Sequence, residues 1–371
     1  MVLLVHPIAC SHSNFIYHLR LFITLKHSTM GNEFTTVIQV SKQFLSSEEI
    51  RQSQESSLMK DQQYQNYVLK KQEVMRFLRF LIIRLKFPIR VLQVTSYLFQ
   101  RFFLFNSFRK YSSYSHEIAV TCLFLSIKMN DCIRKSRDLI LVAHDIRLSP
   151  PLNSDDAVKD ESDLTHILAE NKVDEQRKKV LYFERLILEC IAFDFRHNNI
   201  EDYLIKFSKT LSLHPQMGYL SWLISVDAMM TEVILKQSPH VIALSSIVLA
   251  KLLYPEIFTD KTVITELDSL DLKYSKFYCE RLQIYESVNE MMEFYMNKNQ
   301  LPNSFLFDYL PKDLKFNDLV INLKLELPNH FDIPPNKRKA EATINKDDLF
   351  YKERDYEIGK AGTILFVYNN D

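Results

Sequence analysis

Lys128 and Glu184 are two charged residues within predicted helices that could act together on a partner. Lys128 ends the run 123–128, and Glu184 lies within the run 182–189. An ammonium and a carboxylate held by packed helices can form charge-assisted hydrogen bonds with backbone groups at a helix end of a partner protein. The same two side chains could instead form a structural salt bridge, and the residues alone leave both interpretations open.

Motifs for catalysis, nucleotide binding and metal binding are missing from the sequence. It contains four glycines, and none lies between Gly31 and Gly218, which excludes the Walker and Rossmann phosphate-binding loops. Its five cysteines are scattered without a C-x-x-C pair, so neither a zinc site nor a disulfide framework is predicted, and a reducing compartment fits. His144 and His240 have no second ligand at a metal-ligand spacing. We therefore expect a protein that is not an enzyme and that needs no cofactor or metal.

The charge balance favours a protein partner. Lys+Arg and Asp+Glu both number 46, so the chain lacks the basic excess of a nucleic-acid-binding protein, and no direct nucleic-acid contact is expected. Polar residues interrupt the apolar residues 1–24, which is unlike a signal peptide or a membrane span. At roughly 150 residues per domain, the length predicts about two domains.

Helical periodicity extends from Ser46 to Met296. Ser46 and Glu49 have the spacing of a capping box, and Asn199, Pro215 and Pro239 suit helix starts. Within the first half, an acidic segment after residue 150 reads as a solvated loop. The predicted helices span residues 70–85, 89–103, 117–128, 136–144 and 174–191 in the first half, and 200–211, 219–235, 241–253 and 272–296 in the second.

The resulting organisation is all-α, with two successive helical bundles that meet near Phe195. A disordered or extended N-terminus covers residues 1–43, an N-terminal helix and the first bundle 44–196, and the second bundle 197–298. The C-terminal extension 299–371 is expected to be irregular after Pro302 and to end in a short β-hairpin from about residue 356 to 368, where β-prone runs flank glycines.

Several motifs resemble those of the cyclin family. The run 86–102 ends in Gln100, Arg101 and Phe102 where cell-cycle cyclins have Asp-Arg-Phe, and residues 126–128 stand at the family's Ala-Ser-Lys. Glu184 stands at the glutamate that pairs with that lysine, and residues 193–195 match the aromatic-Asp-apolar turn that ends the cyclin box. In the second half, residues 227–231 and 239–243 match the patterns Asp-x-x-x-Thr and Pro-x-x-Ile-Ala. The match is weaker after Lys128, where cyclins usually carry glutamates and this chain has residues 129–131.

Further segments narrow the resemblance to transcriptional cyclins. Residues 44–46, 85–88, 97–101 and 353–356 are similar to the beta subunits of fungal kinases for the RNA polymerase II carboxy-terminal domain. This resemblance implies a tandem cyclin fold of two five-helix bundles with an N-terminal helix. It also implies a regulatory subunit that binds and activates a cyclin-dependent kinase, with a third (gamma) subunit, the polymerase tail as substrate of the complex, a role in transcription elongation and a nuclear location. The alternative is a cyclin-fold transcription factor or scaffold that activates no kinase.

The expected kinase-binding residues combine this resemblance with the aromatic content. Lys128 and Glu184 match the family's kinase-contacting pair, and Lys71 lies where cyclins usually carry an arginine. Phe99, Phe103 and Phe105 exceed what one buried helix face requires, so we predict that they contribute to a partner surface.

Overall fold

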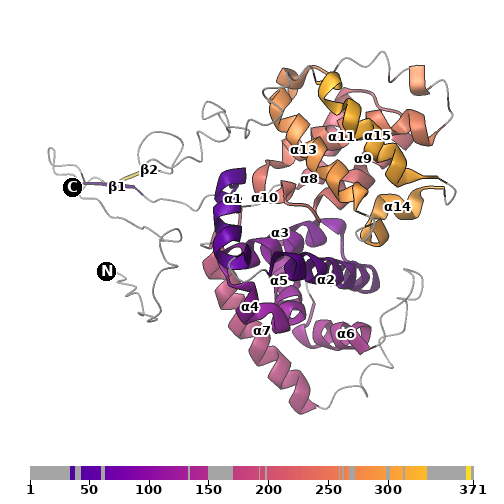
Figure 1. Ribbon diagram of the computed structural model, residues 1–371. Coiled ribbons are helices and arrows are strands. Elements are labelled where there is room, and N and C mark those ends of the chain that lie inside the picture. Colours follow the sequence, from indigo (N-terminus) through magenta and orange to yellow (C-terminus); the bar gives the residue numbers. More distant parts are fainter. Residues whose placement is uncertain are drawn as a thin grey trace.

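The computed structural model describes residues 34–37, 43–331 and 365–368 (Figure 1). Within the middle range, the described residues leave out 60–62, 133, 149–169, 192, 197–198, 259, 261–262, 266, 268–271, 298–300 and 312–313. Two helical bundles form the body of the molecule, with the first bundle below the second in this view. This arrangement is the predicted all-α architecture.

The N-terminal helix starts at the predicted capping box. Helix α1 (Ser47–Gln54) follows Ser46, whose hydroxyl accepts a hydrogen bond from the Glu49 amide at 3.1 Å, while the Glu49 carboxylate accepts from the Ser46 amide at 2.7 Å. A π-helical turn, η1 (Glu55–Met59), extends α1. The Gln54 side chain donates to Glu232 at 2.6 Å, so α1 also contacts the second bundle.

The first bundle surrounds two central helices, α3 and α5. Its five main helices are α2 (Tyr64–Leu85), α3 (Ile89–Phe105), α5 (Ser115–Met129), α6 (Ser136–Leu148) and α7 (Glu170–Cys190), with short turns α4 (Phe108–Tyr111) and η2 (Ser112–Tyr114) between α3 and α5. Helix α2 ends at Lys86, which is left-handed with φ 53°, and Pro88 caps α3. Helices α3 and α5 pack directly against each other. A small polar residue lies at their contact, where the Ser126 hydroxyl donates to the Val91 carbonyl at 2.8 Å.

The second bundle is built around α11. Its helices are α8 (Ile200–Thr210), α9 (Pro215–Ala228), α10 (Val233–Lys236), α11 (Pro239–Ile257), η5 (Tyr274–Phe277) and α13 (Arg281–Met296). Pro215 and Pro239 occupy first turns as predicted, where a missing amide donor costs nothing. Helix α11 is long and apolar enough to cross a membrane by composition, but 67% of that window is buried inside this bundle, as expected for a central core helix.

Two predicted helices of the second half are interrupted. The helix predicted for 219–235 breaks after Ala228, because the Met229 carbonyl turns toward α3 and accepts hydrogen bonds from Ser96 and Gln100. The helix predicted for 272–296 is split by Tyr278, a left-handed residue with φ 56°. Asn199 precedes α8 as predicted, but its side chain makes no capping hydrogen bond.

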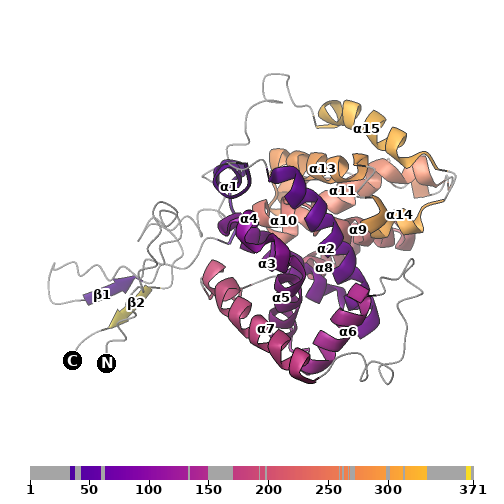
Figure 2. The same cartoon turned by 60° about the horizontal axis from the view of Figure 1, so that its bottom comes forward.

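The prediction of an irregular chain after Pro302 is wrong for the described residues. The segment forms η6 (Leu301–Asn303), α14 (Phe305–Tyr309) and α15 (Phe316–His330). Helix α15 lies over α13 (Figure 2), where it buries Phe316, Val320 and Leu327. Pro328 lies in the last turn of α15 and has no amide hydrogen, so one carbonyl of the preceding turn lacks its intrahelical hydrogen bond.

The N-terminal and C-terminal extensions contribute one strand each. Strand β1 (Phe34–Val37) pairs antiparallel with β2 (Leu365–Tyr368), with Phe34 opposite Tyr368. The first arm of the hairpin predicted for 356–368 lies outside the described residues, as do the acidic segment 150–169 and the similar segment 353–356. In the structure, therefore, the partner of β2 is β1.

The start of the C-terminal extension contacts both bundles and links them. Arg79 of α2 donates to the carbonyls of Asn303 and Ser304 at 3.3 and 3.2 Å and pairs with the Asp308 carboxylate. From the second bundle, the Asp227 carboxylate accepts from the Ser304 hydroxyl at 2.6 Å and from the Phe305 amide at 2.7 Å. Residues 303–308, here called the inter-bundle clasp, thus bind one charged side chain from each bundle.

Candidate partner-binding site

Lys128 and Glu184 meet on one face of the first bundle. Lys128 lies in the last turn of α5 and Glu184 in the second half of α7, two helices that pack directly against each other. The Lys128 Nζ atom lies 2.6 Å from Glu184 Oε1. The Lys128 side chain is 48% exposed and that of Glu184 14%, so this ion pair lies at the surface.

Apolar side chains flank this ion pair. The Lys128 ammonium lies 4.2 Å from the centre of the Phe124 ring, one turn earlier on α5. Leu181, three residues before Glu184 and therefore on nearly the same side of α7, is 61% exposed. We call Phe124, Lys128, Leu181 and Glu184 the docking face. A preformed charge pair beside a partly buried phenylalanine and an exposed leucine is a combination compatible with a protein-binding surface.

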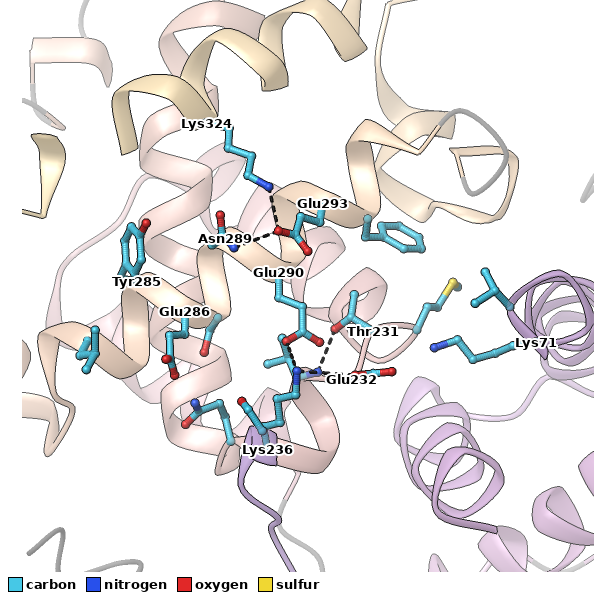
Figure 3. Close-up of a pocket in the computed structure, with 18 of the residues that line it drawn as sticks. Lys71, Thr231, Glu232, Lys236, Tyr285, Glu286, Asn289, Glu290, Glu293 and Lys324 are labelled. Atoms are coloured by element: carbon cyan, nitrogen blue, oxygen red, sulfur yellow. Dashed lines mark hydrogen bonds and ion pairs between the residues drawn. The ribbon is translucent and has the colours of Figure 1, made fainter. Parts of the chain in front are cut away.

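Lys71 does not belong to the docking face. Its ammonium lines a cavity of about 550 Å³ between the bundles (Figure 3) and donates to Gln100 Oε1 at 3.3 Å. Burial lowers the pKa of Lys71. Lys71 stands where cyclins usually carry an arginine, and Gln100 stands where cell-cycle cyclins carry an aspartate. The structure brings these two side chains together. Their geometry indicates a role in joining helices α2 and α3.

Paired charges from α10, α13, α15 and the residue before α10 also line that cavity. Lys236 of α10 lies 2.8 Å from Glu290 and 3.6 Å from Glu232, and Lys324 of α15 lies 2.8 Å from Glu293. Burial raises the pKa of Glu290, which the neighbouring Lys236 partly offsets. These contacts connect α10, α13 and α15 and form an ionic network within the second bundle (Figure 3).

The prediction that Phe99 and Phe103 contribute to a partner surface is wrong. Phe99 is 1% exposed and Phe103 is 0% exposed, because α3 is enclosed by α2, α5, α7 and the N-terminal helix. The Phe103 ring lies 5.0 Å from that of Phe99 and 5.8 Å from that of Tyr67. Phe105 is partly buried, and the Arg101 guanidinium lies 5.3 Å from its ring. The aromatic excess of α3 therefore fills the core.

The described part of the chain offers no metal site. No group of three His, Cys, Asp or Glu residues there could hold a metal ion, and the four cysteines described are free thiols. His240 instead lies within hydrogen-bonding distance of the Ser238 hydroxyl, at 3.0 Å, and of the Tyr278 carbonyl, at 3.2 Å.

Two helical bundles in tandem define a fold of the cyclin type. A model of the cyclin N-terminal domain matches residues 40–196, the N-terminal helix and first bundle. The chain belongs to the cyclin family, and the predicted tandem cyclin fold is confirmed.

The more specific similarity is to one group of cyclins. The chain is 31% identical to CTD kinase subunit beta of Saccharomyces cerevisiae over 288 residues, which cover 77% of this chain and 79% of that protein. CTD kinase subunit beta of Schizosaccharomyces pombe is 32% identical over 166 residues, 45% of this chain and 46% of that one. A chain of the yeast RNA polymerase II CTD kinase CTDK-1 complex superimposes with a TM-score of 0.61 at 27% identity, covering 80% of this chain and 90% of that one.

Proposed function

We propose that this chain is the cyclin subunit of a cyclin-dependent kinase that phosphorylates the carboxy-terminal repeat domain of RNA polymerase II. The observation that carries the proposal is the similarity over 77% of the chain to CTD kinase subunit beta. The docking face adds a physical means of binding, since Lys128 and Glu184 are already held together on one face of the first bundle.

The mechanism is regulatory. The docking face binds the kinase and holds its αC helix inward, so that the catalytic Lys–Glu ion pair of the kinase forms. In the complex, Lys128 and Glu184 hydrogen-bond backbone groups of the kinase, which orient the two proteins. Such coupling is reciprocal, so kinase binding also stabilises the cyclin. The chain itself transfers no phosphoryl group.

The proposal extends to the compartment and the complex in which the chain acts. We place the chain in the nucleus, in a complex with a third (gamma) subunit, where phosphorylation of the polymerase tail promotes elongation. The alternative, a cyclin-fold scaffold or transcription factor without kinase activation, predicts binding without a change in kinase activity.

Reconstitution tests this function. The purified chain, the kinase subunit and their mixture are each incubated with ATP and a polymerase-tail peptide, and phosphate incorporation is measured. We expect none from the chain alone and a strong increase when the kinase is added to it. Binding without an increase would favour the scaffold, and phosphorylation by the chain alone would contradict a regulatory role. Imaging of the tagged chain checks its nuclear location.

A further inference from the structure

Two turns meet at one end of the first bundle. One joins α2 to α3 and the other joins α5 to α6, a helix that also lies beside α2 (Figure 2). The Arg134 guanidinium of the second turn donates to the Leu85 carbonyl of the first at 3.4 Å. Together the turns carry six basic side chains, here called the basic patch: Arg84, Lys86, Arg90, Arg134, Lys135 and Arg137.

Positive charge exceeds negative charge at the basic patch. Residues 84–90 contain no acidic residue. The carboxylates within residues 131–138, and the one on α6 that contacts the patch, are Asp131, Asp138 and Asp145. Asp145 forms an ion pair with Arg84. Six positive charges against three negative ones leave an excess of three.

The patch has hydrogen-bond donors without an acceptor. The Arg84 side chain is only 5% exposed, yet its Nε and Nη2 atoms have no hydrogen-bond partner among the described residues, and neither has Arg90 Nε. The ammonium groups of Lys86 and Lys135 are on exposed residues and form no hydrogen bond or ion pair with a described side chain. Because unpaired N–H groups on a buried cation are costly, an anion held beside these groups would stabilise the patch.

We propose that the basic patch binds a phosphorylated segment of a partner protein. Guanidinium groups match phosphate oxygens in a bidentate geometry, and lysines add charge. A phosphoserine carries about −1.5 to −2 charges at neutral pH, so two of them match the excess of three, which a single carboxylate does not. The net charge of the chain is zero, and a patch confined to two turns offers no extended basic track for a nucleic-acid backbone.

The basic patch is a neighbour of the docking face. Lys128 lies three residues before the second turn begins at Asp131, and the Ser126 hydroxyl of the same helix binds the Val91 carbonyl just after the first turn. A partner on the docking face therefore has part of its surface close to the patch. The proposal itself does not depend on which kinase the chain regulates, because it concerns the isolated chain.

Fluorescence polarisation with the full chain tests the proposal. The probe is a labelled peptide with two phosphoserines among glycines, and the comparison peptides carry serine or glutamate at the same two positions. We expect saturable binding of the phosphopeptide that weakens as salt is raised, at least about 5-fold weaker binding of the glutamate peptide, and none of the serine peptide. Equal binding of the phosphoserine and serine peptides overturns the proposal, as does equal or tighter binding of a DNA oligonucleotide.

Two variants locate the site. Arg90→Ala and Lys135→Ala should each weaken the phosphopeptide by about 2- to 5-fold, the loss of one partly exposed charge contact. Arg84 is left intact because its ion pair with Asp145 also joins α2 to α6. The matched control is Lys206→Ala, which removes an exposed lysine of α8 that has no partner among the described residues. Unchanged affinity in the folded Arg90→Ala and Lys135→Ala variants overturns the proposal.

A third variant tests whether the chain supplies its own anion. The acidic segment 150–169 contains five Asp and Glu residues and lies outside the described residues. Replacing all five by Asn or Gln should change the affinity for the phosphopeptide by less than about 2-fold. A gain of more than about tenfold overturns the proposal, because it assigns the patch to this segment of the same chain.

Discussion

Replacing Lys128 or Glu184 by alanine distinguishes a docking role from a structural one. The geometry predicts a small effect on the stability of the free chain and a large effect on kinase binding. The Lys128 side chain is 48% exposed, so the ion pair contributes only about 0–1 kcal/mol to the stability of the free chain. Alanine at either position should therefore leave a folded helical protein. In a complex, the same charges lose their water, and truncating one partner of a desolvated, hydrogen-bonded charge contact costs about 2–5 kcal/mol.

The expected result is a dissociation constant for the kinase that rises at least about 30-fold in each variant. Isothermal titration calorimetry measures it, while circular dichroism and urea unfolding check the fold. Arg185→Ala is the matched control: Arg185 is one residue beyond Glu184 on α7, forms an exposed ion pair with Glu189 at 2.9 Å and points about 100° away from Glu184. It should bind the kinase as the wild type does.

The double variant adds a test of pairing. If Lys128 and Glu184 act as one unit in the complex, the loss in the double variant should be clearly smaller than the sum of the two single losses. A Lys128→Ala variant that folds and binds the kinase with wild-type affinity would refute the reasoning. In that case the ion pair serves only to join α5 and α7.

Three further predictions concern the fold. Arg79→Ala should lower the free energy of unfolding by about 3 kcal/mol, since it leaves the clasp without its charged partner from the first bundle. Urea unfolding measures this loss, with the exposed Arg76→Ala as the control, and equal losses in the two variants would contradict the clasp. Burial raises the pKa of Asp227 from 3.8 to about 6, so the folded state binds this proton more tightly than the unfolded state. The contribution of Asp227 to stability is therefore full below pH about 4 and falls by about 3 kcal/mol as the pH rises through 6, a slope that Asp227→Asn should lack in urea unfolding across this range. Phe103→Ala should cost about 3–5 kcal/mol of stability without changing the kinase affinity of the protein that remains folded, whereas a loss of affinity at unchanged stability would restore Phe103 to a partner surface.

Local sequence rules predicted the helices and bundles well, and they failed where distant residues decide the backbone path. The capping box at Ser46 and the proline starts at Pro215 and Pro239 depend on neighbouring residues alone, and all three are confirmed. The break after Ala228 depends on α3, which is more than a hundred residues away and supplies the donors for the Met229 carbonyl. No periodicity in the chain carries that information.

The same distinction between local patterns and distant contacts applies to the site residues. Lys128 and Glu184 were identifiable because the family motif marks both positions, and the structure brings them together. The number of phenylalanines on α3 was misleading, since a helix enclosed on all sides has no outer face. The clasp was missed because Arg79 and Asp308 are far apart in sequence, and an arginine in an apolar helix has no local partner that would reveal its role.

The clasp also adds charged contacts to the continuous apolar core that joins the two bundles. Arg79 is 8% exposed at its side chain, and Asp227 is buried, so removing residues 303–308 would leave a buried cation in one bundle and a buried carboxylate in the other. Each uncompensated charge is costly, which opposes any rotation that separates the bundles from the clasp. The residues that oppose this rotation therefore also keep the second bundle at a set orientation to the docking face on the first bundle.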